Sequence, residues 1–257
     1  MKTRLYTRKR ALISSVAMLL VAMIALGTAT FAWFTSTTSA TAKDLSVQTT
    51  KSSELKVAKN DLDFKDEISY GVSNKVLRPI TSSDGSNWYS SVAAAKTAPA
   101  SNGTYTSQTD LDNFVVVDML NIKNVGGQPC TGVKITVTAT FKSSFARLAV
   151  VPCDTQETAG ATNMPAITED NFKANIYGLA ANRAWKPYNG TALTTADYKT
   201  KAAANGAEIP VGTMAANEVK SYKVLVWFEG EDTDCFDTTT ADLTVPKIEF
   251  SVTGSTT

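Results

Sequence analysis

The sequence predicts an all-β protein, an antiparallel β-sandwich or jelly roll with long loops and at most one or two short helices. Threonine and valine, which favour strands, are abundant, while leucine is scarce for a helical protein. In several short segments apolar and polar residues alternate with a period of two, as they do in half-buried strands. Turn-forming Gly, Asn and Pro residues separate these segments, a pattern typical of sandwiches and barrels.

The strand signals occur along most of the chain. They lie at residues 44–50, 53–59, 114–124, 133–142, 146–153, 218–228 and 242–254. The two strongest, 114–124 and 133–142, flank the turn cluster VGGQPCTG, which predicts that they pair as an antiparallel hairpin. Pro246 has no backbone N–H, so we expect 242–254 to be an edge strand or to contain a bulge.

Residues 51–257 are expected to form a single β-sandwich domain with a loop-rich insertion around residues 154–210. Within that insertion, Thr194 has the features of a helix N-cap and Gly206 those of a residue just past a helix end. A short helix between them is therefore expected.

The N-terminal segment has the layout of a secretory signal peptide. Five basic residues in the first ten precede an uncharged apolar run, and small residues follow. Cleavage after Ala32 would make residues 1–32 the signal peptide and Trp33 the first residue of the mature chain. A second candidate cut lies between Ala42 and Lys43.

An uncleaved membrane anchor is the alternative interpretation of this segment. Residues 11–34 are long enough to span a bilayer, which takes about 20 apolar residues. Trp33 and Phe34 would then lie at the outer interface, with the basic end inside. Both interpretations place the rest of the chain outside the membrane, secreted or at the cell surface, and only the second gives a membrane contact.

Charge and composition argue against several function classes. Residues 1–32 hold five of the 25 basic residues and none of the 24 acidic ones, so the remainder has a net charge of about −4. A nucleic-acid partner is not expected, because it would need a basic surface.

The chain has no histidine, which excludes HExxH zinc sites and Ser-His-Asp triads. We predict no enzymatic activity; a hydrolase using Glu229 with Asp232 or Asp237 is a remote alternative.

Acidic residues crowd the segment VWFEGEDTDCFD. They are Glu229, Glu231, Asp232, Asp234 and Asp237. Clustered carboxylates suit Ca²⁺, which takes about six to eight oxygen ligands, although the spacing is not that of an EF-hand. The alternative is an acidic, solvated hairpin loop. Calcium is the single cofactor that the sequence suggests.

The cysteines predict one disulfide and one remaining thiol if the protein is extracellular. They are Cys130, Cys153 and Cys235. The pairing stays open, with Cys153 and Cys235 as the candidate pair because each follows a strong strand segment.

The leader also resembles that of a known family. The basic start, ALISSV and GTATFAWFTST are similar to the leaders of TasA/camelysin-type proteins of Gram-positive bacteria. The resemblance implies cleavage by a SipW-type signal peptidase near Trp33 and a role as a secreted subunit of biofilm-matrix fibres. The segments LRPITSSDGSNWY and W-x-E-G-x-D-x-x-C also resemble a pattern in secreted, uncharacterised proteins of clostridia, which implies no activity.

These observations lead to a functional hypothesis. Residues 33–50 form a flexible N-terminal segment and a candidate donor strand, which would enter the sheet of a neighbouring subunit. The apolar residues of this segment are Trp33, Phe34, Leu45 and Val47. The protein is thus predicted to be a surface or extracellular-matrix structural protein that associates with itself or with related matrix subunits.

The alternative function is that of a membrane-tethered binding module or adhesin. In this interpretation, aromatic residues expected in exposed loops bind a glycan or a protein. These residues are Trp88, Tyr89, Trp185 and Tyr188. The alternative is that they cap the core or pack against the loops and bind nothing.

Overall fold

The computed structural model describes residues 46–49, 55–70, 75–91, 105–235, 245 and 247–256. The chain divides into two units, residues 1–41 and 42–257, and every described residue belongs to the second. The predicted signal peptide, its cleavage positions and the donor-strand residues Trp33, Phe34 and Leu45 lie outside the described residues. Within the described ranges, no helix is long and apolar enough to cross a membrane.

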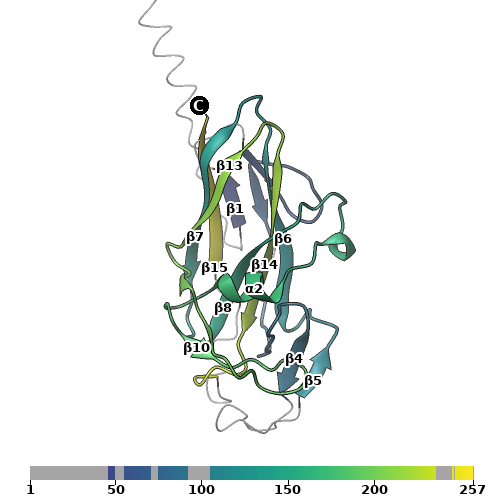
Figure 1. Ribbon diagram of the computed structural model, residues 1–257, viewed down its shortest axis with the longest axis vertical. Coiled ribbons are helices and arrows are strands. Elements are labelled where there is room, and N and C mark those ends of the chain that lie inside the picture. Colours follow the sequence, from purple (N-terminus) through teal and green to yellow (C-terminus); the bar gives the residue numbers. More distant parts are fainter. Residues whose placement is uncertain are drawn as a thin grey trace, which may run out of the picture. The chain divides into compact units, whose positions relative to one another are not determined.

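The prediction of an all-β sandwich is confirmed. Two larger sheets form its layers (Figure 1). The six-stranded sheet has the order β12 (Ala202–Ala203), β9 (Ile176–Gly178), β8 (Ala146–Cys153), β14 (Val219–Phe228), β6 (Val115–Asn124) and β2 (Leu55–Ala58). The five-stranded sheet has the order β13 (Glu208–Met214), β7 (Cys130–Thr140), β15 (Lys247–Thr256), β1 (Ser46–Thr49) and β3 (Glu67–Ser69).

Several smaller elements accompany the two sheets. Two short antiparallel pairs are β4 (Trp88–Ser91) with β5 (Tyr105–Gln108), and β10 (Ala184–Trp185) with β11 (Tyr198–Lys199). Within the described residues, the helical elements are α2 (Glu169–Ala174) and a 3-10 turn (Ala161–Asn163). The short helical content agrees with the predicted fold class.

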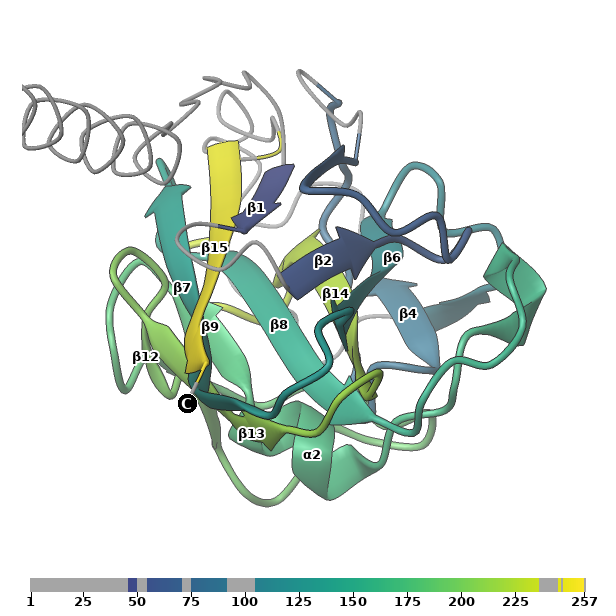
Figure 2. The ribbon, with the colours of Figure 1, turned by 90° about the horizontal axis from the view of Figure 1, so that it is seen from above.

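The main core lies between the two sheets, which Figure 2 shows from above. The predicted alternation of 133–142 is confirmed, because Val133, Ile135 and Val137 are buried while the residues between them are not. Phe250 of β15 and Val224 of β14 belong to the same apolar cluster. Each such side chain contributes roughly 1.5–3 kcal/mol when it is fully removed from water.

A second apolar cluster covers the outer face of the six-stranded sheet. Trp227 of β14 packs there against Trp88 and Phe172, with ring centroids 5.5 and 5.6 Å apart. Figure 1 shows α2, which carries Phe172, lying across this sheet. Burial on both faces explains why apolar residues follow one another directly in parts of these strands, as in residues 115–117 of β6 and 224–228 of β14.

The predicted hairpin of 114–124 with 133–142 is wrong. β6 pairs with β14 and β2, whereas β7 pairs with β13 and β15 in the other sheet. The turn cluster between them therefore carries the chain across the sandwich. The reason is burial: β6 has apolar contacts on both faces, which a hairpin with one solvent-facing side does not provide.

Of the two alternatives for the last strand, the edge position is wrong and a bulge-like irregularity is present. β15 is an interior strand, with β7 on one side and β1 on the other. It begins at Lys247, directly after Pro246, so the proline precedes the hydrogen-bonded ladder. A register shift does occur in this strand, between Thr253 and Ser255.

The helix expected between Thr194 and Gly206 is also wrong. This segment instead forms β11 and β12, and β12 pairs with β9 parallel. Tyr198 is buried there and its hydroxyl donates to the carbonyl of Ser83, a tertiary contact that overrides the local helix signal. The helix lies earlier, where Thr168 caps α2 by accepting from the Asn171 N–H.

Candidate functional site

The acidic segment begins where β14 ends, and backbone hydrogen bonds hold its start on two neighbouring segments. The Glu229 N–H donates to Phe145 O at 2.8 Å, just before β8. The Gly230 N–H donates to Ile80 O at 3.0 Å, next to a short bridge between Ile80 and Glu229. Residues 229–235 are called the acidic turn below. These backbone hydrogen bonds attach the start of the acidic turn to the sandwich.

Two arginines neutralise the centre of the acidic turn. Arg147 of β8 and Asp232 are both fully buried and form an ion pair through Nη2 and Oδ2. Arg183 donates from Nε to the same Oδ2 at 2.9 Å and pairs with the other oxygen through Nη2. Arg183 also lies 2.8 Å from a carboxylate oxygen of Asp234. One carboxylate thus bridges two guanidinium groups inside the protein.

The buried guanidinium of Arg147 has several further contacts. Its Nη1 donates to the carbonyl of Ser144 at 2.6 Å and to that of Ala146 at 3.1 Å. The ring of Trp185 lies 4.5 Å from its central carbon, a cation–π distance. Burial lowers the pKa of Arg147, and the negative charges of Asp232 and Glu229 oppose that shift.

Glu229 is a buried carboxyl group at the first position of the acidic turn. Its Oε2 accepts from Trp227 Nε1 at 3.1 Å and its Oε1 accepts from the Glu231 N–H at 3.0 Å. Burial raises its pKa to about 7, and these hydrogen bonds and Arg147 reduce the shift. Glu229 therefore changes its protonation state near neutral pH.

The predicted calcium ligands are engaged by other groups of the protein. Asp232 is held by Arg147 and Arg183, Asp234 accepts from Ser144 Oγ at 2.6 Å, and Glu229 faces Trp227. Among the residues that the structure describes, no group of three or more His, Cys, Asp or Glu side chains is placed to hold a metal ion. Asp237 lies outside those residues, so Ca²⁺ binding by the whole set stays a prediction.

The predicted disulfide between Cys153 and Cys235 is not formed. Cys153 keeps its thiol, which donates to the Ser221 carbonyl at 3.4 Å, at one end of the β8–β14 pair. Ser221 lies opposite Cys153, and the strand runs about 23 Å from there to Phe228 at about 3.3 Å per residue. Cys235 follows at that far end, where its N–H donates to the carbonyl of Asp232, the partner of Arg147. A disulfide needs Cα atoms within about 7 Å. In the sequence both cysteines follow a strong strand segment, but the topology places the ends of those two strands at opposite ends of the β8–β14 pair.

The loop aromatics divide into two kinds. Trp88 and Trp185 are buried, which contradicts their expected exposure as binding residues and agrees with the alternative that they pack against the core. Tyr89 and Tyr188 are half-buried and contact each other edge to face, with centroids 5.1 Å apart. Tyr105, which the sequence did not single out, stacks on Tyr188.

Sequence reasoning missed both arginines of the site. Arg147 had a usable signal, because a lone charge inside the apolar strand segment ARLAVV requires a buried partner. Arg183 had none, since it lies in an irregular segment whose position depends on the tertiary fold.

The acidic turn is suited to a structural role, in which it holds neighbouring segments together. Its carboxylates are engaged by arginines, hydroxyl groups and backbone N–H groups.

Comparison with protein-family models, with curated proteins and with solved structures gives no match for this chain.

Proposed function

We propose that this protein is an extracellular structural subunit that assembles by adding a strand of one copy to the sheet of the next. The observation that supports this most is β1. It is a four-residue strand at the end of the candidate donor segment 33–50, and it carries Val47. It lies between β15, to which it is parallel, and β3, to which it is antiparallel. Within one chain β1 already fills this position, so residues 46–49 belong to the sandwich and not to a flexible segment, contrary to the expectation for 33–50. Strand addition would require the same strand of a neighbouring copy to take this place.

β1 is suited to exchange because its pairing is short. It covers Glu249–Val252, four positions of the ten-residue strand β15. Parallel pairing is slightly less stable per residue than the antiparallel pairing of β15 with β7. If the same strand of a neighbour replaces β1, each hydrogen bond that is lost within a chain is regained between chains.

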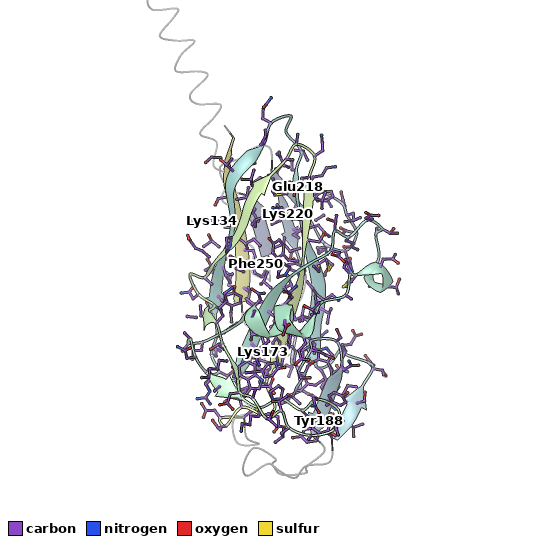
Figure 3. All side chains as sticks on the ribbon, viewed as in Figure 1. Lys134, Lys173, Tyr188, Glu218, Lys220 and Phe250 are labelled. Atoms are coloured by element: carbon purple, nitrogen blue, oxygen red, sulfur yellow. The ribbon has the colours of Figure 1, made fainter. Side chains whose placement is uncertain are left out.

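The β13 edge of the five-stranded sheet is protected against pairing with another chain. β13 contains Pro210, and its register shifts around Gly212. Lys220 donates to the carbonyls of Val211 and Thr213 at 2.9 and 2.8 Å, which occupies acceptors of that strand. Figure 3 labels Lys220 with Glu218 and Lys134 on the half of the sandwich that holds β13. These features favour the β1 position for assembly.

A trans cross-linking experiment tests the proposal. Gln48 and Ser251 are directly opposite each other in the β1–β15 pair, and neighbouring strands lie about 4.8 Å apart, within disulfide range. The native cysteines are replaced by serine, and one chain carries Gln48→Cys while a second carries Ser251→Cys. The two chains are mixed under assembly conditions and oxidised. We expect a disulfide between the two different chains and filaments in negative-stain electron micrographs.

The control pairs Gln48→Cys with Thr138→Cys, which lies in β7 on the far side of β15. This pair is expected to give little cross-linking. Filaments without the Gln48–Ser251 cross-link would disprove strand addition at β1, and persistent monomers at all concentrations would disprove the structural role.

The alternative of an aromatic binding module has less support. Two of its four aromatics, Trp88 and Trp185, are buried in the second cluster. Tyr89 and Tyr188 retain exposed surface, but each uses part of its ring on another tyrosine.

A further inference from the structure

Three tyrosines gather where the β4–β5 pair meets the segment after β10. Tyr105 and Tyr188 stack with ring centroids 3.9 Å apart and planes 5° from parallel, and Tyr89 meets Tyr188 at 82°. All three are half-buried, so solvent reaches them. Figure 3 shows Tyr188 at the end of the sandwich that carries β4 and β5.

The Tyr105–Tyr188 stack is closer than aromatic pairs normally prefer. Offset or edge-to-face arrangements with centroids roughly 4.5–7 Å apart are favoured over a parallel sandwich. At 3.9 Å in nearly parallel planes, the ring carbons of the two residues are in van der Waals contact. The surrounding backbone must therefore hold the two rings together.

A tight turn holds Tyr188 in this position. Its backbone bridges to Leu193, and the Asn189 side chain accepts from the N–H groups of Thr191 and Ala192, both at 3.0 Å. Gly190 has φ of +97°, and a Cβ there would lie 2.6 Å from the Tyr89 hydroxyl. Tyr89 thus packs directly on the glycine of the turn.

Tyr105 also has a proton acceptor in place. Burial raises its pKa, and the negative charge of Glu231 and a hydrogen bond to that side chain raise it further. Glu231 is 7% exposed and its N–H donates to Glu229, so this residue is buried within the acidic turn. Removing an electron from a phenol requires loss of the phenolic proton, and Glu231 is placed to take it.

We propose that Tyr105 and Tyr188 are an oxidative modification site, at which a one-electron oxidant couples the two rings into an intramolecular dityrosine. Each phenol loses one electron to the oxidant and its O–H proton, Tyr105 to Glu231 and Tyr188 to water. The two ring radicals form one carbon–carbon bond between the positions ortho to the oxygens. The two ortho C–H bonds then break as the rings regain aromaticity, with protons returning to the phenolate oxygens.

The net change is the loss of two hydrogen atoms per protein, with two electrons passed to the oxidant. The new bond would join β5 to the turn after β10, two segments far apart in the sequence. The bond would covalently cross-link these segments at the end of the sandwich where the acidic turn lies. This modification does not depend on assembly, so it stands or fails separately from the proposed structural role.

Photo-oxidation of the full-length protein tests the proposal. The oxidant is photoexcited tris(bipyridine)ruthenium with persulfate as the final electron acceptor, at a protein concentration low enough to keep monomers apart. We expect dityrosine fluorescence in the monomer, a mass lower by two hydrogens, and a linked peptide pair containing Tyr105 and Tyr188. Tyr105→Phe and Tyr188→Phe should each abolish the linked pair.

The matched control is Tyr89→Phe, which touches the same stack but keeps both coupling partners, and it should retain the cross-link. Each variant keeps its ring, and circular dichroism checks that each is folded. An undiminished signal in Tyr188→Phe, a linked pair that includes Tyr89, or dityrosine found only between molecules would overturn the proposal. So would the absence of dityrosine in folded wild-type monomer.

Discussion

Arg147 and Asp232 form an ion pair in which neither side chain is exposed to solvent, and it joins β8 to the acidic turn after β14. The partners come from segments that are distant in the sequence. Their burial makes the pair sensitive to the loss of either member, because a charge left alone in the interior is not solvated.

Asp232→Ala should destabilise the protein more than Arg147→Met does. The aspartate substitution leaves Arg147 buried without the carboxylate that pairs with it, and breaking a buried pair in this way costs about 3–5 kcal/mol. Arg147→Met leaves Asp232 paired with Arg183, so the loss should be smaller. Urea unfolding of both variants measures the difference. If both variants lost the same free energy of unfolding, Arg183 would not be compensating for the missing charge of Arg147.

Stability should fall as the pH rises from about 4.5 to about 7 because of Glu229. Its pKa is about 7 in the folded protein against an ordinary value of 4.5, so in this range the folded state holds a proton that the unfolded chain has released. The free energy of unfolding then decreases with pH, by roughly 3 kcal/mol over the window at about 1.4 kcal/mol per pKa unit.

The matched variant for that experiment is Glu229→Gln, which keeps an acceptor for Trp227 but does not titrate. The pKa of Asp118 is also raised by burial and that of Asp234 is lowered, chiefly by its hydrogen bond with Ser144. Subtracting the pH profile of Glu229→Gln from that of the wild type removes their contributions. If the difference in unfolding free energy between the wild type and Glu229→Gln did not change with pH, Glu229 would have the pKa of an exposed glutamate.

Gly85→Ala should destabilise the second apolar cluster. Gly85 has φ of +69°, and a Cβ there would lie 2.6 Å from Phe172 Cδ2 and 2.9 Å from Ile167 Cδ1. Steric overlap of this kind costs about 1–3 kcal/mol, and the left-handed backbone adds about 1 kcal/mol. Gly127→Ala is the control, because nothing lies within 4 Å of its Cβ. Thermal unfolding should separate the two variants clearly.

Cys153 should be recovered as a thiol. Burial raises its pKa to about 11, so little thiolate forms at neutral pH and alkylation of the folded protein should be slow. After unfolding without a reductant, the peptide that contains Cys153 should be alkylated completely. Recovery of a peptide linked to Cys235 would contradict the separation of the two residues in the fold.

The sequence by itself determined the fold class and much of the core. The alternation of Val133, Ile135 and Val137 identified the buried face of β7, because successive side chains on a strand point to opposite sides. The acidic cluster was equally visible, as were the turn residues that end the strands. These features are local, so a single segment contains the information.

Only the tertiary structure decided which strands pair and what the acidic turn contacts. β6 and β7 are consecutive strands in different sheets, and the partners of Asp232 are Arg147 and Arg183. The same holds for Trp88, which looked like a loop aromatic until α2 and β14 covered it. Pairing and burial depend on contacts between distant segments, and a local pattern of residues does not specify which segment supplies the other side.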